Sequence, residues 1–222
     1  MSYELHPSEE LRAHFQGKPW QGSDPAKALF LFIGLDANYK NIRDKEMLQE
    51  ILDYHNDGVA YWQTKRFHHP FMLPHYHGDG KRYHCKFAEI GFTPEDAELV
   101  SFVELLHLPT TGTSHLKPSD LSTDHLRFLA KIFDCGSARY IFLPPGVTRL
   151  MRQTREFPWL PKIPLRTDGD LSVLREQNGQ TVYEIYHLSC HYNKQLSKLK
   201  KQIAQVREIV RTCTKDKPIK SE

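Results

Sequence analysis

Two side chains of opposite chemical character stand near opposite ends of this sequence, in two short polar segments. Asp36 lies in residues 34–39 (GLDANY), and His187 begins residues 187–192 (HLSCHY). A carboxylate stabilises developing positive charge, and an imidazole N–H stabilises developing negative charge. Together, the two groups suit the heterolytic cleavage of a bond.

Both segments directly follow runs that are predicted to form buried strands, residues 28–33 (ALFLFI) and 181–186 (TVYEIY). In an open α/β sheet, the loops at the carboxyl ends of the strands form the ligand crevice. We therefore expect Asp36 and His187 to lie across one cleft, at the ends of neighbouring parallel strands.

The two segments resemble the signature motifs of the uracil-DNA glycosylase superfamily. The first motif there reads roughly G-x-D-P-Y-H or G-x-N-P-G, and the second reads H-P-S-P-L or N-P-S-G-L. This chain keeps the glycine, the acid, the histidine and the serine at the family spacing. It has Ala37, Leu188 and Cys190 where the family has prolines. Weaker similarity to the mismatch-specific branch extends over residues 29–192.

The resemblance implies a role for each matching residue. Asp36 would orient water and stabilise an oxocarbenium-like sugar, and His187 would donate a hydrogen bond to a carbonyl oxygen of the leaving base. Ser189 would contact a flanking phosphate. The remaining substrate-binding candidates of the first motif are Gly34, Leu35 and Asn38.

Three further positions have counterparts in the family. Phe67 lies in a stretch that resembles F-x-H-P, where the aromatic ring stacks on the flipped base. At the strand end where several families use an asparagine to read uracil, this chain offers His107 or Glu104, and we place His107 among the substrate-binding candidates. The DNA wedge position is occupied by His191, with Tyr192 beside it.

Each of these residues also has a simpler structural interpretation. Asp36 could form an Asx turn or cap, and His187 could be a core histidine with satisfied hydrogen bonds. Phe67 could pack within its loop, and Ser189 could stabilise a turn. The second motif favours the catalytic role of Asp36, and both interpretations of the other residues stay open.

Composition narrows the class of protein. The chain has 222 residues, 39% of them hydrophobic, a formal charge of +3 and four widely spaced cysteines. These numbers fit one domain and argue against a disulfide framework, a zinc ribbon or an iron–sulfur cluster. A dense group of possible metal ligands, which we interpret as a His-rich loop rather than a metal site, comprises His68, His69, His75, His77, His84 and Cys85.

Alternating predicted strands and helices indicate an α/β fold with three layers, α/β/α, around a central, mostly parallel four-stranded sheet. The hairpin signal Asn178-Gly179 joins two of the strands. We expect a single glycosylase-like domain over residues 1–212 and a basic flexible tail over residues 213–222.

The sequence thus predicts a monomeric, cytoplasmic, monofunctional DNA glycosylase that removes uracil or another damaged base from single-stranded or damaged duplex DNA. It would need no metal or organic cofactor and would not associate with a membrane. One alternative is a catalytically inactive nucleic-acid or nucleotide-binding protein of the same fold. Another is a hydrolase that acts on free nucleosides.

Overall fold

The computed structural model describes residues 2–40, 42, 44–113 and 115–215. Its helices are α1 (Glu9–Gly17), α2 (Lys45–Asn56), α3 (Gly58–Lys65), η1 (Pro70–Met72), α4 (Lys81–Ala88), η2 (Pro94–Leu99), η3 (Pro118–Asp120), α5 (Thr123–Cys135), α6 (Pro145–Met151) and α7 (Asn193–Lys215). Its strands are β1 (Tyr3–Leu5), β2 (Trp20–Gly22), β3 (Phe30–Asn38), β4 (Val100–Thr113), β5 (Tyr140–Leu143), β6 (Arg166–Asp168), β7 (Leu171–Gln177) and β8 (Gln180–Glu184).

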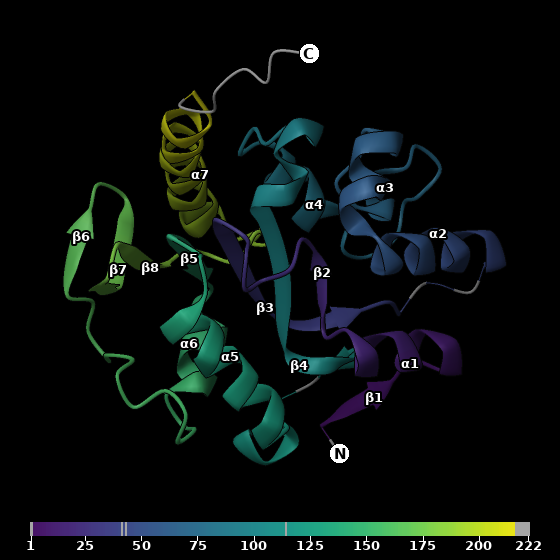
Figure 1. Cartoon of the computed structure of the whole chain (residues 1–222), viewed down its shortest axis with the longest axis horizontal. Helices are drawn as coiled ribbons and strands as arrows, with labels where there is room; N and C mark the ends of the chain where they lie inside the picture. Colours follow the sequence, from purple (N-terminus) through teal and green to yellow (C-terminus); the bar gives the residue numbers. More distant parts are fainter. Residues whose placement is uncertain (1, 41, 43, 114, 216–222) are drawn as a thin grey trace.

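The strands form one sheet in the order β1-β4-β3-β5-β8-β7-β6, with β2 also paired to β4 (Figure 1). The central strands β4, β3, β5 and β8 are parallel to one another, whereas β1, β2, β7 and β6 pair antiparallel at the two sides. The predicted α/β class is confirmed. The sheet has eight strands in the described chain, because short antiparallel strands extend it beyond the four expected.

Side chains alternate between two core clusters, one on each face of the sheet. Leu31 and Ile33 of β3 pack in a cluster with α5 and α6. Phe30 and Phe32 of the same strand pack in the other cluster, with α4 and α7. The period of two in β3 therefore fixes which of its residues face α4 and α7.

Strand β3 is longer than the sequence predicts, and it includes most of the first motif. Residues 34–38 pair with β4 instead of forming a loop after the strand. Ala37 is opposite Pro109, and Asn38 is opposite Thr110. Proline would restrict the backbone at position 37 and remove its N–H, so alanine there is compatible with continued pairing.

Strand β4 contains a bulge beside this motif. Asp36 is opposite Leu106, but the next residue, Ala37, is opposite Pro109. His107 and Leu108 therefore have no partner on β3. The bulge brings the last part of β4 alongside Asp36.

Helix α7 packs against the sheet through an apolar stripe, with Leu199, Ile203, Val206 and Val210 buried. The helix continues to Lys215, so the first residues of the predicted tail, 213–215, are helical. The Cys213 thiol even contacts the Tyr140 hydroxyl at 3.4 Å. Residues 216–222 lie outside the described part of the chain. No helix within the described ranges is long and apolar enough to cross a membrane.

The β7–β8 hairpin depends on a turn with two left-handed residues, Asn178 at φ 53° and Gly179 at φ 76°. We predict that Gly179→Val lowers the free energy of unfolding by about 1–2 kcal/mol, because a side chain with a Cβ is strained in this conformation. Urea denaturation measures the change. Gly146→Ala is the control, because Gly146 is exposed in α6 with open space around it. An equal loss in both variants would contradict the turn argument.

Candidate active site

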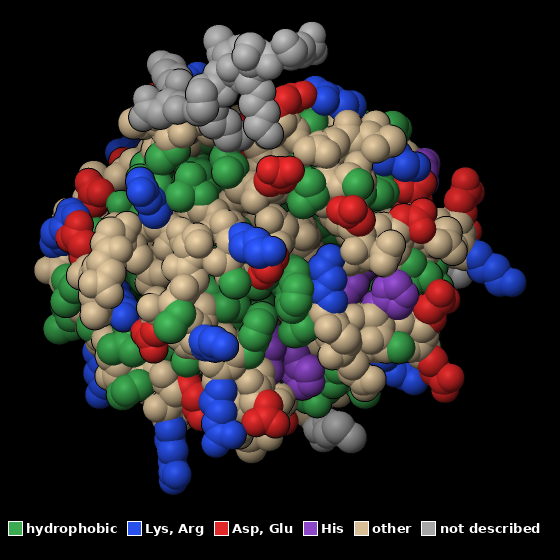
Figure 2. All heavy atoms as spheres, viewed as in Figure 1, with side chains coloured by type: hydrophobic (Ala, Val, Ile, Leu, Met, Phe, Trp, Pro, Cys, Tyr) green, Lys and Arg blue, Asp and Glu red, His purple; other side chains and the backbone are tan. Residues whose placement is uncertain are grey.

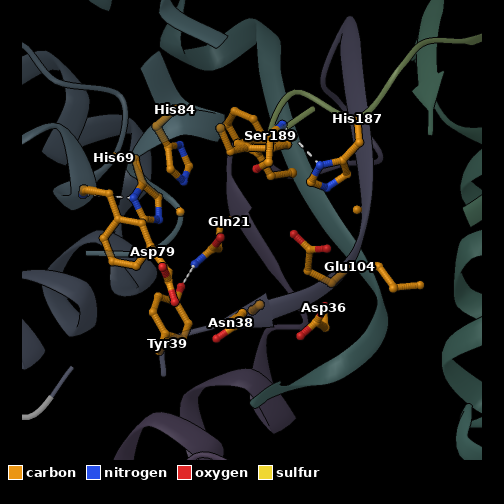
Figure 3. Close-up of a pocket in the computed structure, with 17 residues that line it drawn as sticks. Gln21, Asp36, Asn38, Tyr39, His69, Asp79, His84, Glu104, His187 and Ser189 are labelled. Atoms are coloured by element: carbon orange, nitrogen blue, oxygen red, sulfur yellow. Dashed lines mark hydrogen bonds between the residues drawn. The ribbon is translucent and has the colours of Figure 1, made fainter. Parts of the chain in front are cut away.

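A cavity of about 230 Å³ lies beside the carboxyl-terminal half of β3 and the adjoining part of β4 (Figure 3). Its walls come from β2, β3, β4, the segment 69–71, the start of α4 and the loop after β8. The lining residues are Gln21, Gly34, Leu35, Asp36, Ala37, Asn38, Tyr39, His69, Phe71, Asp79, Gly80, Tyr83, His84, Phe102, Glu104, His187 and Ser189.

Asp36 and His187 line this same cavity, although they are about 150 residues apart in the sequence. Their strands are not neighbours as expected, because β5 lies between β3 and β8. The loop after β8 brings His187 to the cavity, whereas Asp36 lies on β3 itself.

Asp36 is a half-buried carboxylate held by two hydroxyl groups. Thr110 Oγ1 donates to Asp36 Oδ2 at 2.7 Å, and Thr113 Oγ1 donates to Asp36 Oδ1 at 3.4 Å. Burial raises the pKa of Asp36 above its usual value, and the two hydroxyl donors oppose that rise. The donors favour the charged form of the carboxylate.

Glu104 brings a second carboxyl into the cavity. It is directly opposite Gly34 in the β3–β4 pairing. A Cβ at position 34 would overlap the Glu104 carboxyl oxygens, so only glycine leaves room for this group. Burial, with a further contribution from the charge of Asp36, raises the pKa of Glu104 to about 8.

The surroundings of the two carboxyl groups therefore favour different protonation states. Asp36 receives two hydrogen bonds, which favour its anion. Glu104 is desolvated and lies near that anion, which favours its neutral acid. Pairs of carboxyls whose environments separate their pKa values are typical of sites for acid–base chemistry.

The geometry of the second motif orients the His187 ring. The backbone N–H of Ser189 donates to His187 Nδ1 at 3.2 Å, and the ring packs against Tyr83 with 5.5 Å between centroids (Figure 3). Although the residue is exposed, the surrounding protein lowers the pKa of His187 through desolvation. In the neutral ring, Nδ1 is an acceptor, so Nε2 carries the proton and can donate to a ligand.

Two histidines from the His-rich region, His69 and His84, form part of the opposite wall, and His68 packs against His84 outside the lining. His69 and His84 stack at 3.7 Å between centroids, and His68 Nε2 lies 3.1 Å from His84 Nδ1. Burial lowers the pKa of all three, that of His68 to about 3. Among the described residues, no group of three or more His, Cys, Asp or Glu side chains is arranged to hold a metal ion. The stack is thus a neutral aromatic wall.

The structure brings some of the other predicted residues to the cavity and leaves four outside, Phe67, His107, His191 and Tyr192. Gly34, Leu35, Asn38 and Ser189 line it, as the motifs require. Phe67 and His107, both predicted to bind substrate, do not line it.

Phe67 packs against the core cluster around α1 and α2. The ring that reaches the cavity from this region is Phe71, which lies in η1. The F-x-H-P stretch led the sequence analysis to Phe67. In the structure the last residue of this stretch begins the 3-10 helix η1, and Phe71, four positions after Phe67, lines the cavity instead.

His107 lies on the other face of the sheet, where its ring is 5.3 Å from that of His125 in α5. Along β4, Val103 and Leu105 share that face, whereas Phe102 and Glu104 face the cavity. Strand alternation therefore assigns the cavity position to Glu104.

His191 and Tyr192, the predicted wedge, do not line the cavity. They lie two and three residues beyond Ser189, both exposed, with their rings stacked at 4.5 Å. Tyr192 is 65% exposed, which is unusual for so large an apolar ring. The pair forms an aromatic projection on the surface beside the second motif.

Charges of both signs are interspersed on the face of the molecule in Figure 2, and no continuous basic patch is visible there. Helix α7 has an exposed row of cations, comprising Lys194, Lys198, Lys200 and Lys201.

Comparison of the sequence with protein-family models finds no match, and comparison with curated proteins finds none.

We predict that Glu104→Gln stabilises the protein at alkaline pH. The raised pKa means that the stabilising contribution of the neutral acid is complete below the usual value of 4.5 and is lost as the pH rises to about 8. The glutamine variant lacks this loss, so its free energy of unfolding should exceed that of the wild type by about 1–3 kcal/mol at pH 9.

Urea denaturation at pH 5 and pH 9 measures this difference. Glu98→Gln is the control, since Glu98 is an exposed carboxyl outside the cavity. If the stability of Glu104→Gln follows the same pH dependence as the wild type, Glu104 ionises normally and the argument for its neutral form is wrong.

Proposed function

We propose that this chain is a DNA glycosylase-like hydrolase that cleaves the N-glycosidic bond of uracil or another damaged base. The observation that carries the proposal is the presence of Asp36 and His187 in one cavity, with opposite electrostatic character. Thr110 and Thr113 favour a charged Asp36, and Ser189 leaves the Nε2 proton of His187 available. The mostly parallel centre of the sheet and the helices on both of its faces agree with the architecture that the motif resemblance implies.

In this proposal each of the two groups stabilises one product of bond cleavage. The Asp36 carboxylate stabilises the positive charge that develops on the sugar and orients the attacking water. His187 Nε2 donates a hydrogen bond to the carbonyl oxygen of the leaving base, where negative charge accumulates. These steps require only fixed charges, a donor and a positioned water.

The cavity walls suit a flat heterocycle. Phe71 and Tyr83 supply aromatic surface, and the stacked His69 and His84 rings extend it. Stacking of a base on such rings contributes about 1–3 kcal/mol and tolerates different bases. The lysines along α7 and the aromatic pair after Ser189 would contact the rest of a DNA strand.

A second candidate is a hydrolase of free nucleosides. The interspersed charges in Figure 2 favour it, because a protein that tracks DNA phosphates usually concentrates positive charge. The same two catalytic groups would act, and no wedge would be needed. A site that binds a nucleotide without cleaving it is the outcome expected if neither substrate is hydrolysed.

We predict that Asp36→Asn and His187→Ala each lower the rate of base excision by about 10²–10³-fold while DNA affinity changes much less. Both remove interactions made mainly in the transition state. A single-stranded oligonucleotide with one uracil, followed by alkaline strand scission, measures excision. A free nucleoside is assayed in parallel.

The matched control is His107→Ala, because His107 is the histidine of β4 that lies outside the cavity. Excision that persists at the wild-type rate in both cavity variants would overturn the assignment. Turnover of the nucleoside without turnover of the oligonucleotide would select the second candidate.

We also predict that the wild-type protein prefers single-stranded substrates, because an imidazole at the wedge position fills a vacated base stack poorly. Unstacking a base in a duplex costs a few kcal/mol that a single strand largely avoids. His191→Leu should raise duplex excision and leave single-strand excision little changed. Excision of one modified base in paired and unpaired oligonucleotides measures this. Equal wild-type rates on the two substrates would show that His191 is not a wedge.

A further inference from the structure

The mechanism above gives no role to Glu104, a titratable group that lines the cavity. Figure 3 shows the Glu104 carboxyl pointing into the cavity, with Asp36 on one side and His187 on the other. None of the described residues makes a hydrogen bond to this carboxyl. It is therefore open to a ligand.

The backbone next to Glu104 is shaped to hold the carboxyl in this place. Gly34 is its direct partner on β3, and any side chain there would occupy the space of the carboxyl oxygens. The glycine of the first motif thus has a local function. It allows the Glu104 carboxyl to lie against the strand that carries Asp36.

Glu104 and Asp36 differ in what surrounds them. Asp36 has two threonine hydroxyls that donate to its oxygens, whereas Glu104 has none. Desolvation and the neighbouring Asp36 charge favour a proton on Glu104 at neutral pH. The cavity thus favours an anion at Asp36 and a neutral acid at Glu104, on adjacent strands.

We propose that Glu104 is the general acid of this site and protonates the leaving base as its bond to the sugar breaks. The inference rests on the proposed function. The electron pair of the carbon–nitrogen bond goes to the base, and the Glu104 O–H bond breaks as its proton binds a nitrogen or oxygen of that base. Water then adds its oxygen to the sugar carbon, and the proton that this water releases restores the acid form of Glu104.

A general acid at Glu104 widens the range of bases that the site can remove. A general acid helps most when the leaving group is a poor anion, because protonation removes the charge that would otherwise develop on it. His187 alone only stabilises such an anion. With Glu104 as acid, the site suits bases that leave poorly without a proton.

Several other titratable groups face the cavity and must be considered in any pH profile. They are Asp36 on β3, Tyr39 just after it, His69 before η1, Asp79, Tyr83 and His84 around α4, and His187 after β8. Burial lowers the pKa of His69, His84 and His187 and raises that of Tyr39 and Tyr83. Of these groups Glu104 alone has a pKa raised to about 8, so it accounts for a loss of activity there.

The test compares the wild-type chain, Glu104→Gln and Glu98→Gln on two single-stranded oligonucleotides that differ by one atom. One contains uracil and the other 5-fluorouracil, which is the better leaving group because fluorine stabilises its anion. Initial excision rates are measured between pH 5 and pH 9. Glutamine keeps the shape of the neutral acid and can donate a hydrogen bond, but it cannot transfer a proton.

We expect wild-type excision of uracil to fall as the pH rises through about 8. Glu104→Gln should lack this fall and should excise uracil about 100-fold more slowly than the wild type at pH 7. Its loss on 5-fluorouracil should be at least tenfold smaller. Glu98→Gln should behave as the wild type.

Equal losses on the two bases would overturn the general-acid role while leaving the proposed function intact. Wild-type rates in Glu104→Gln would do the same. Absence of excision by the wild type on both substrates would instead overturn the proposed function, and the general-acid role with it. Urea denaturation of Glu104→Gln and of the wild type distinguishes a loss of folding from a loss of catalysis.

Discussion

The site depends on the cost of placing two carboxyl groups in one poorly solvated cavity. Both cannot easily carry charge, because each ionised carboxyl disfavours ionisation of the other. The chain resolves this conflict through Thr110 and Thr113, which donate hydrogen bonds to Asp36 but not to Glu104. The pairing of β3 with β4 thus also determines which of the two carboxyl groups favours a proton, and the roles of Asp36 and Glu104 follow from it.

Local sequence signals predicted much of the fold because they are short-range. Ser8 and Ser122 cap α1 and α5 through their side chains, a role that serine often has at the start of a helix. Asn178-Gly179 forms the predicted hairpin turn. The apolar stripe of α7 is also a local pattern, because its buried residues recur every three or four positions. Each of these features is decided within a few residues of the chain.

What the sequence did not predict depends on partners distant in the chain. The length of β3 depends on pairing with β4, and the insertion of β5 between β3 and β8 depends on the order of the whole sheet. The choice of His107 over Glu104 was wrong for a different reason. Alternation along β4 was available from the sequence, since Phe102 and Glu104 share one side of the strand and Val103 and Leu105 share the other. A comparison of motifs alone does not consider which side of the strand each residue faces.

The bulge in β4 has a consequence for how this protein can vary in length. His107 and Leu108 are two additional residues between the partners of Asp36 and Ala37. A strand alternates its faces at every residue, so loss or gain of one residue here would turn Thr110 away from Asp36, whereas a change of two would keep its face. Relatives of this chain that keep the chemistry should therefore differ in this segment by even numbers of residues. The number of residues between the positions of Glu104 and Thr110 can then be used to identify such relatives.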